Sequence, residues 1–328
     1  MMMSKDNAFL SVRDLVVEYT AEGQVIHAVN GVSFDLERGK TFGLVGETGS
    51  GKTTIPKAIL RILPDPPAKI RGGEIYLDGV DLLKLSAKEM RKIRGRKISM
   101  IFQDPMTALN PIMKIGLQVA EVIKMHNDIT WREANKRAVR MLETVGIPAD
   151  RFGEYPHQFS GGMGQRVVIA IALACSPELL IADEPTSALD VTIQAQVLEM
   201  IAKLKKEFNT SMVMISHNLG VVAEQCDDLA VVYAGEIVEL GSKEAVFDRP
   251  THPYTKGLLG AVPKLDEERE RLDRIPGMPP DPSDLPAGCH FNPRCPIATE
   301  RCGNEKIDLR EIEPGHFCRC INVSGPEG

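Results

Sequence analysis

The sequence has no long apolar segment. No stretch of its 328 residues approaches the roughly 18–20 consecutive apolar residues that a membrane-spanning helix requires. The longest apolar run, residues 167–175, is about half that length and fits a buried helix. The first residues also lack the apolar core of a secretory signal. We therefore expect a protein that stays in the cytoplasm and reaches a membrane only through partners.

An excess of positive charge is also missing. The chain carries 39 Lys and Arg residues against 45 Asp and Glu residues, which gives a formal net charge of −6. Proteins that coat nucleic acid are basic, so we expect no nucleic-acid partner. The one basic run, residues 91–97, is more typical of a solvated loop. Hydrophobic residues make up 43% of the chain and charged residues 26%, as in an ordinary globular protein.

The most informative motif is Gly46–Thr53, which matches the pattern G-x-x-x-x-G-K-[ST] without a mismatch. An apolar run, Thr41–Val45, precedes it and predicts a strand, and the helix-compatible run Thr54–Leu63 follows it. The glycines let successive N–H groups point at the phosphates, and the helix N-terminus adds partial positive charge. Lys52 would reach the β- and γ-phosphates, and the hydroxyl of Thr53 would bind Mg²⁺. The motif predicts that the protein binds ATP or GTP.

Two short apolar runs each end in polar residues. Leu179–Ala182 is followed by Asp183 and Glu184, and Met212–Ile215 is followed shortly by His217. Each run fits a strand buried on both faces of a parallel sheet, and such sheets bind ligands at the carboxyl ends of their strands. Asp183 would bind Mg²⁺ and Glu184 would polarise the attacking water. The alternatives are acids that cap a helix and a histidine satisfied in the core.

The rest of the chain divides into segments with different residue patterns. Leu10–Tyr19, Gly31–Leu36 and Glu74–Leu77 alternate apolar and polar residues and predict strands, several of them antiparallel. Residues 109–175 show helical periodicity. Pro276–Pro286 is rich in proline and predicts an extended linker before a small cysteine-rich tail.

A second glycine-rich turn, Ser160–Gln165, precedes another apolar run. A serine and glycines at a helix start form an anion site, and one nucleotide cannot easily occupy two such sites of one chain. The economical arrangement is a dimer in which this turn closes over the γ-phosphate bound by the other chain. An N-cap followed by a buried helix would give the same pattern.

In their order and spacing, these motifs resemble those of the ATP-binding subunits of ABC transporters. The matching positions are Gly46–Thr53, Gln103, Ser160–Gln165, Leu179–Glu184, Ser187–Asp190 and His217. The resemblance implies an α/β fold, a RecA-like P-loop nucleotide-binding domain over residues 4–250. It would contain an antiparallel β subdomain and an inserted helical subdomain at about 105–176, and residues 251–328 would form a C-terminal extension.

The resemblance also implies roles for individual residues. Glu184, His217 and Gln103 would be catalytic, and Thr53, Gln103 and Asp183 would hold Mg²⁺. Ser187–Asp190 would line the dimer interface. The residues expected to bind ATP are Tyr19, Gly46, Glu47, Thr48, Gly49, Ser50, Gly51, Lys52, Thr53, Thr54, Ser160, Gly161, Gly162 and Met163. Tyr19 would stack on adenine, although an aromatic in an early strand is as often core and His27 competes for the role. Asn218 stands where the family commonly has Asp, and Met163 where it often has Gln.

Five of the seven cysteines crowd into the tail with the spacing C-x₅-C-x₆-C-x₁₅-C-x-C. In a cytosolic protein such crowding favours a metal over disulfides. The spacing is wider than most zinc knuckles and differs from the common ferredoxin patterns, so it leaves zinc, a cluster, a disulfide or free thiols open.

The tail resembles the C-terminal region of the dipeptide/oligopeptide subfamily of these ATPases. The residues that carry this resemblance are Thr251–Leu259, Cys289–Pro296, Cys302, Gly315, His316 and Cys320. The resemblance implies a [4Fe–4S] cluster on Cys289, Cys295, Cys302 and Cys320, with Zn²⁺ as the alternative. Cys318 would be an extra thiol, or the fourth ligand in place of Cys320. A structural staple for a small tail is its favoured purpose.

We therefore expect a peripheral ATPase on the cytoplasmic face of the cell membrane that powers import of di- or oligopeptides. Its partners would be a related or identical ATPase subunit, two membrane permease subunits and, indirectly, an extracellular or periplasmic binding protein. A nickel complex or an oligosaccharide is the alternative cargo. Two other classes are weaker: a soluble ABC ATPase of DNA repair or translation, and an iron–sulfur redox protein with a vestigial nucleotide site.

Overall fold

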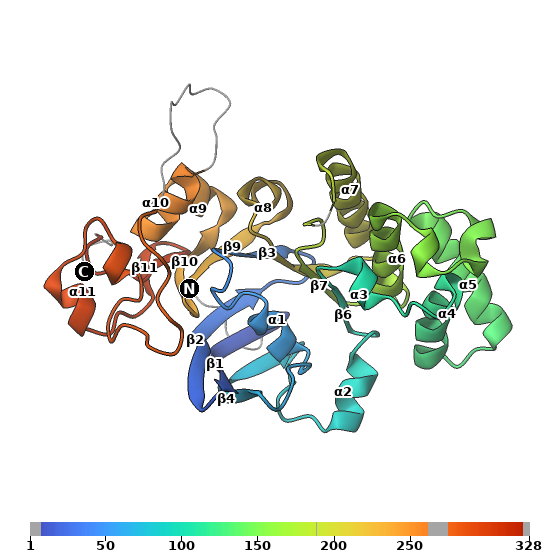
Figure 1. Cartoon of the computed structure of the whole chain (residues 1–328), viewed down its shortest axis with the longest axis horizontal. Helices are drawn as coiled ribbons and strands as arrows, with labels where there is room; N and C mark the ends of the chain where they lie inside the picture. Colours follow the sequence, from blue (N-terminus) through green and yellow to red (C-terminus); the bar gives the residue numbers. More distant parts are fainter. Residues whose placement is uncertain (1–7, 188, 262–274, 324–328) are drawn as a thin grey trace. The chain divides into compact units, whose positions relative to one another are not determined.

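The computed structural model describes residues 8–187, 189–261 and 275–323, and the chain divides into two compact units (Figure 1). Unit 1 combines the segments Met1–Lys84 and Ile215–Gly328, and unit 2 comprises Leu85–Met214. The Gly46–Thr53 loop and the cysteine-rich tail therefore belong to the same unit, although more than 200 residues separate them.

The first sheet of unit 1 has the strand order β2-β1-β4-β5 and antiparallel pairing. Its strands are β1 (Leu10–Ala21), β2 (Gln24–Leu36), β4 (Ala68–Leu77) and β5 (Val80–Asp81). Glu22 and Gly23 join β1 to β2 with φ angles of 50° and 82°. Two consecutive positive φ angles make the tight turn that matches the twist of a hairpin. The predicted antiparallel strands are confirmed, and β2 begins earlier than the sequence suggested.

The other strands of unit 1 follow the order β11-β12-β10-β9-β3. They are β3 (Thr41–Val45), β9 (Asp228–Tyr233), β10 (Glu236–Ser242), β11 (Arg310–Glu313) and β12 (His316–Cys318). Strands β3 and β9 are parallel, whereas β9, β10, β12 and β11 pair antiparallel. The strand predicted before the glycine-rich motif is confirmed. Two strands of the tail join this sheet, which the sequence analysis did not foresee.

The helices of unit 1 are short. They are α1 (Thr54–Ile59), α8 (Leu219–Gln225), α9 (Lys243–Asp248), α10 (Pro253–Gly260), the 3₁₀ turn η3 (Asn292–Arg294) and α11 (Glu300–Asn304). Helix α1 is shorter than the predicted Thr54–Leu63, because Arg61 adopts a φ of 51° that an α-helix cannot continue. Residues 276–286 contain no helix or strand, as predicted for the linker.

Unit 2 contains short strands and most of the longer helices. The strands are β6 (Ile98–Ile101), β7 (Leu179–Asp183) and β8 (Ser211–Ile215), in the order β8-β7-β6. The helices are α2 (Ala87–Ile93), α3 (Pro105–Ala108), α4 (Ile115–His126), α5 (Trp131–Thr144), α6 (Gly161–Leu173) and α7 (Val191–Glu207), with 3₁₀ turns η1 (Ala149–Gly153) and η2 (Pro156–Gln158). The predicted helical stretch is confirmed. Across the described residues, no helix is both long enough and apolar enough to cross a bilayer.

A buried carboxylate ties the tail to the second sheet of unit 1. Glu239 lies in β10 with no exposed surface. Its carboxylate accepts hydrogen bonds of 2.8 Å from the backbone N–H groups of Thr251 and His252, and a contact of the same length joins it to Nε2 of His316. A buried carboxylate is tolerated when its oxygens are bonded in this way. The segments before α10 and at β12 are thus fixed to one strand.

We expect the stability of the protein to depend on pH because of His252, whose N–H contacts Glu239. Burial lowers the pKa of His252 from its ordinary 6.5 to about 4. Between these values the unfolded chain binds a proton that the folded chain does not, so the free energy of unfolding falls as the pH falls. The stability that depends on neutral His252 is fully present above about pH 6.5. We expect it to decrease by up to about 1.4 kcal/mol per pH unit towards pH 4, or about 3 kcal/mol in total.

The variant His252→Asn provides the control. Nδ1 of His252 accepts a 3.1 Å hydrogen bond from the N–H of Tyr254, and an asparagine oxygen can replace that acceptor without titrating. Urea unfolding of both proteins between pH 7.5 and 4.5 should show a shallower loss of stability in the variant. Parallel losses would show that His252 is not the titrating group.

Candidate functional site

The Gly46–Thr53 loop leaves the wholly buried strand β3 and passes close to two backbone segments. Gly46 and Gly51 have φ angles of 148° and 97°. A Cβ at Gly46 would lie 2.1 Å from the carbonyl oxygen of Val232, and one at Gly51 would lie 2.2 Å from that of Ala28. Only glycine fits these positions, because any side chain would collide with main chain that cannot move aside.

Lys52 is held by the loop itself. Its ammonium donates to the carbonyl oxygens of Gly46 at 2.8 Å and Glu47 at 2.6 Å, and to Oγ of Ser50 at 3.3 Å. The residue is 5% exposed. Thr53 follows as the N-cap of α1. The loop therefore presents a lysine, a hydroxyl and glycine N–H groups, which is the donor set that a triphosphate with Mg²⁺ requires.

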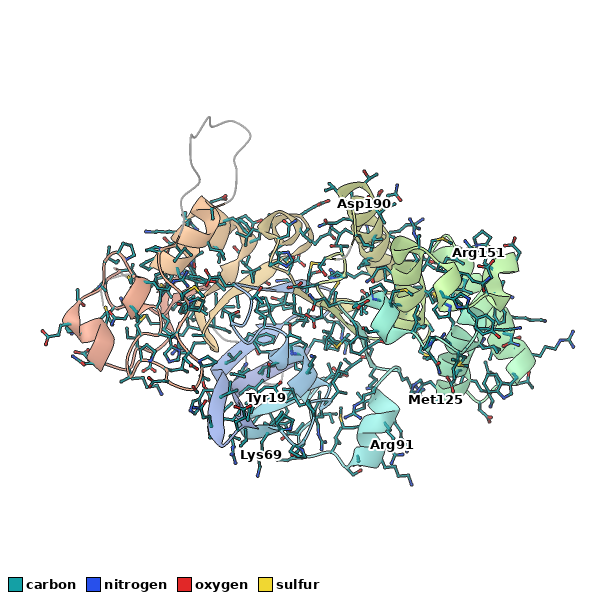
Figure 2. The ribbon with its side chains drawn as sticks, viewed as in Figure 1. Tyr19, Lys69, Arg91, Met125, Arg151 and Asp190 are labelled. Atoms are coloured by element: carbon teal, nitrogen blue, oxygen red, sulfur yellow. The ribbon has the colours of Figure 1, made fainter. Side chains whose placement is uncertain are left out.

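Tyr19 and His27 both lie beside this loop. Tyr19 lies in β1 (Figure 2). Its hydroxyl is 3.5 Å from Oγ1 of Thr54. His27, in β2, lines a small cavity together with Thr48 and Gly49, and its N–H donates to the carbonyl of Pro282 at 2.9 Å. Stacking of Tyr19 on adenine stays a prediction, with His27 as its competitor.

His217 is exposed in the turn between β8 and α8. The preceding residue, Ser216, donates its N–H to the carbonyl of Leu44 at 3.3 Å, so the turn adjoins the strand that leads into the loop. Asn218 is the N-cap of α8 and accepts hydrogen bonds from the N–H groups of Gly220 and Val221. Asparagine and aspartate are equally good N-caps, so this departure from the family pattern leaves the helix start intact.

Unit 2 brings together two of the predicted catalytic side chains. Nε2 of Gln103 donates to Oε2 of Glu184 at 2.9 Å. Glu184 has a φ of 46°, a left-handed conformation that costs a non-glycine residue about 1–2 kcal/mol. The preceding Asp183 ends β7 and is 3% exposed. Strain of this kind concentrates at functional sites, and here it sets the direction of the glutamate.

The second glycine-rich turn begins at Ser160, the N-cap of α6. Ser160 is exposed, and its Oγ accepts a hydrogen bond from the N–H of Met163 at 3.4 Å. Gly161 is exposed and Gly162 half-buried. The sulfur of Met163 accepts a hydrogen bond of 3.3 Å from Nη1 of Arg151. Arg151 can be seen in Figure 2.

The Ser187–Asp190 segment is described except for Ala188, which lies outside the described residues. Asp190 is the N-cap of α7 and accepts from the N–H of Ile193 at 3.0 Å (Figure 2). Ser187 donates its hydroxyl to the carbonyl of Glu184 at 3.2 Å. A role of this segment at a dimer interface stays a prediction.

The described structure gives no support for the expected metal site on the tail cysteines. Across the described residues, no three or more His, Cys, Asp or Glu side chains are placed to hold a metal ion. Burial raises the pKa of the Cys289 thiol to about 11 and also raises that of Cys295 and Cys320, whereas metal ligands are thiolates. Neither the predicted cluster nor the alternative Zn²⁺ on Cys289, Cys295, Cys302 and Cys320 is therefore supported.

The fifth cysteine of the tail, Cys318, is also buried. It is fully buried in β12 and packs with Ile312 and Cys320 in a small apolar cluster. Burial raises the pKa of its thiol strongly. Cys318 is thus a core residue of the tail.

Two family models match the sequence. The model described as ABC transporter matches residues 29–187, and the model described as oligopeptide/dipeptide transporter, C-terminal region, matches residues 238–302. The dipeptide transport ATP-binding protein DppD of Bacillus subtilis is 52% identical over 312 residues, which cover 94% of this chain and 91% of that protein. The oligopeptide transport ATP-binding protein OppD of Escherichia coli is 48% identical over 317 residues, 96% of this chain and 93% of that protein. The chain belongs to the dipeptide/oligopeptide family of ABC transport ATP-binding proteins.

Solved structures agree with this assignment to the ABC family. The ATP-binding cassette MJ0796, a dimer in a post-hydrolysis state bound to ADP and Pi, matches with a TM-score of 0.65 and 27% identity over 71% of this chain and 98% of that chain. The cbiO1 protein of Clostridium perfringens, part of the ABC transporter complex cbiONQ, matches with a TM-score of 0.63 and 26% identity over 74% and 92%. The predicted α/β nucleotide-binding fold is confirmed.

Sequence reasoning missed two residues that this ABC protein places against its phosphate loop. Arg294, in the tail, donates from both Nη atoms to the carboxylate of Glu47 at 2.8 and 3.1 Å. The hydroxyl of Tyr254 accepts from the N–H of Glu47 at 2.9 Å. Both residues belong to segments that resemble the subfamily, but their separation of more than 200 residues from the loop gave no signal of contact.

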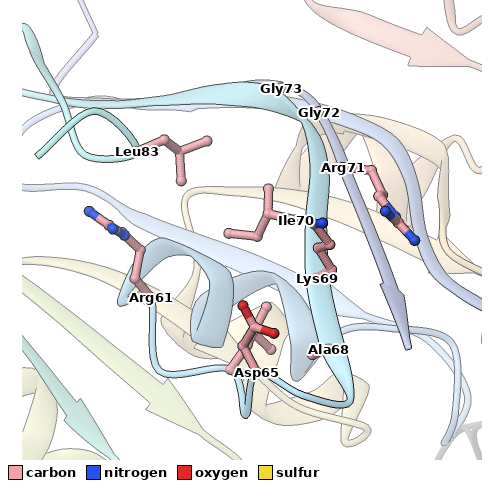
Figure 3. Close-up of a pocket in the computed structure, with 10 residues that line it drawn as sticks. Arg61, Asp65, Ala68, Lys69, Ile70, Arg71, Gly72, Gly73 and Leu83 are labelled. Atoms are coloured by element: carbon pink, nitrogen blue, oxygen red, sulfur yellow. The ribbon is translucent and has the colours of Figure 1, made fainter. Parts of the chain in front are cut away.

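A separate cavity of about 500 Å³ lies in unit 1 between β4 and the segment after α1 (Figure 3). Its lining mixes apolar side chains such as Ile70 with the charged Arg61 and Asp65. Arg61 already donates to the carbonyl of Leu82 at 3.1 Å. The cavity contains no residue of the predicted nucleotide site, and we assign it no function.

The close approach at Gly51 predicts an unequal effect of two alanine substitutions. Gly51→Ala places a Cβ 2.2 Å from a backbone oxygen, whereas Gly49→Ala, which also has a positive φ (82°), meets nothing within 4 Å. We expect Gly51→Ala to lower the free energy of unfolding by at least about 2 kcal/mol more than Gly49→Ala does. Urea unfolding of the two variants measures the difference, and equal losses would contradict the steric argument.

Proposed function

We propose that this protein is the ATP-hydrolysing subunit of an importer of dipeptides or oligopeptides. The glycine loop that holds Lys52 is the observation that carries the proposal. Membership of the dipeptide/oligopeptide family supports the cargo class. The reaction is transfer of the γ-phosphoryl group of ATP to water, in which catalysis consists of positioning and electrostatic stabilisation.

The predicted site residues have separate roles in this proposal. Lys52 and the N–H groups of residues 49–54 would bind the phosphates. The Thr53 hydroxyl, Gln103 and Asp183 would hold Mg²⁺, which would neutralise developing charge. Glu184 polarises the attacking water, and its hydrogen bond to Gln103 supports this role because it fixes the carboxylate. His217 contacts the γ-phosphate, and Tyr19 stacks on adenine.

We further propose that the working form is a dimer of nucleotide-binding domains with two membrane permease subunits. The exposed turn at Ser160 and Gly161 supports this arrangement, because its serine and N–H groups can bind the γ-phosphate of ATP held by the other subunit. The other subunit is a related ATPase or a second copy. ATP favours the closed dimer, and hydrolysis releases it. The protein acts at the cytoplasmic face of the membrane, and a binding protein delivers the cargo outside.

The domain boundaries are part of the same proposal. Residues 4–250 form the nucleotide-binding domain with its helical subdomain at about 105–176, which accords with the helices from Pro105 to Leu173. Residues 251–328 form the C-terminal extension. The other cargoes, a nickel complex or an oligosaccharide, are tested by uptake of labelled substrates through the reconstituted complex.

Glu184→Gln tests the catalytic assignment. The amide keeps the shape of the side chain but cannot act as a base, so ATP hydrolysis should fall at least about 100-fold while ATP binding persists. Phosphate release and gel filtration in MgATP measure turnover and dimer formation, and the variant should accumulate an ATP-bound dimer. Glu143→Gln, an exposed acid on α5, is the control. Normal turnover in Glu184→Gln would refute its role.

The tail cysteines carry a finer proposal, namely that Cys289, Cys295, Cys302 and Cys320 hold a [4Fe–4S] cluster as a structural staple. Burial raises the pKa of Cys289, and the smaller charge effects of Cys295, Cys320 and Cys302 on this thiol indicate that the four cysteines lie near one another, as a shared cluster requires. At Cys302, burial is outweighed by hydrogen bonds from Thr299 and Asn322, so the pKa of this thiol is lowered. Donors to sulfur favour the thiolate that a cluster binds.

Anaerobic purification tests the cluster. The native protein should be brown with about four iron atoms per chain, and Cys295→Ser should be pale and iron-poor. Cys175→Ser, which replaces a cysteine of unit 2, should keep the colour. A colourless native protein, or one that contains zinc, would refute the cluster and leave the ATPase proposal unaffected.

A further inference from the structure

The tail reaches the phosphate loop through one buried arginine. The guanidinium of Arg294 and the carboxylate of Glu47 form a two-pronged ion pair with distances of 2.8 and 3.1 Å. The side chain of Arg294 is 5% exposed and that of Glu47 is 28% exposed. A shielded, bidentate pair of this kind has a defined geometry and is less screened by salt than a surface pair.

Arg294 is itself held from the other sides. Its Nε donates to the carbonyl of Pro276 at 2.9 Å, and Nη1 also donates to the hydroxyl of Tyr233 at 3.2 Å. The rings of Tyr233, Tyr254 and Phe291 pack together with centroid distances of 4.6 to 5.4 Å. Each of the three is at most 2% exposed. These hydrogen bonds and packed rings hold the guanidinium of Arg294 in place, so it does not move with Glu47.

Glu47 is constrained through three of its groups. Its N–H donates to the hydroxyl of Tyr254 at 2.9 Å, its carboxylate is paired with Arg294, and its carbonyl oxygen accepts from the ammonium of Lys52 at 2.6 Å. A rotation of this residue would move the carbonyl that contacts Lys52. The position of Glu47 and the position of the lysine ammonium are thus linked by direct contact.

We propose that Arg294 is a positioning residue for ATP binding: it holds Glu47, and through Glu47 it sets the phosphate loop around Lys52. The inference rests on the proposed ATPase function. It makes the C-terminal region a part of the nucleotide site's support, in addition to any role in transport. Arg294 lies outside the loop, and its effect passes through Glu47, which is in the loop.

An arginine is needed for this task. Its fixed fork of donors meets both carboxylate oxygens, the carbonyl of Pro276 and the hydroxyl of Tyr233 at once. A lysine carries the same charge on a single flexible ammonium and cannot reproduce the bidentate contact. Arg294→Lys therefore removes the geometry and keeps the charge.

Direct measurement of MgATP binding to the full-length protein tests the proposal. We expect Arg294→Lys to raise the Kd for MgATP about five- to tenfold, and Glu47→Gln to raise it by a similar factor. The double variant should bind no more weakly than Arg294→Lys alone, since both changes break one linkage. Tyr254→Phe, which removes only the acceptor for the Glu47 N–H, should weaken binding by a smaller factor and provides a milder variant if Arg294→Lys folds poorly.

Arg319→Lys is the matched control for a general effect on the tail. Arg319 is also a buried arginine of the C-terminal region, but it donates to the carbonyls of Ile237 and Ile307. Within the described part of the chain, no hydrogen bond or ion pair joins it to the loop. The variant Arg319→Lys should lower the thermal stability of the protein without changing its Kd for MgATP.

The possible outcomes separate the two proposals. Multiplicative effects in the double variant, an unchanged Kd in both Arg294→Lys and Tyr254→Phe, or an equal loss of affinity in Arg319→Lys would overturn the positioning role alone. A native protein that fails to bind MgATP would overturn the proposed function as well.

Discussion

The backbone contacts around the glycine loop are the constraint on which the rest of unit 1 depends. Gly46 and Gly51 approach the carbonyl groups of Val232 and Ala28 so closely that no side chain fits between them. The loop is therefore enclosed by β9 at Gly46 and by β2 at Gly51. This enclosure fixes a curled backbone that places Lys52 against its own carbonyls.

Two buried charged side chains, Glu239 and Arg294, connect the tail to the rest of unit 1. Glu239 is fully buried and satisfied by three partners, so it fixes the tail to the sheet. Arg294 reaches from the tail to Glu47 and so extends the support to the loop. A buried charge is costly unless it is bonded on all sides, and both groups meet that condition by joining segments distant in sequence. The C-terminal region is thus continuous with the nucleotide-binding core of unit 1.

Local patterns predicted the elements well where chemistry and periodicity agreed. The strand before the loop, the strands that end at Asp183 and Ile215, and the helical stretch of unit 2 all appear in the structure. The helix after the loop ends early because Arg61 adopts a left-handed conformation that propensity did not indicate. The tail strands β11 and β12 were missed, because four and three residues give too little alternation to recognise.

The sequence alone determined the phosphate-loop motif, the acidic strand end and the family, because each depends on residue types at short, fixed spacings. Only the tertiary structure decided what surrounds the loop. Contacts such as Arg294 with Glu47 and Tyr254 with the Glu47 N–H join positions more than 200 residues apart, and no local pattern encodes that distance. The cysteine spacing suggested a metal, but whether thiols converge and lose their protons is set by burial and by neighbouring donors in the folded tail.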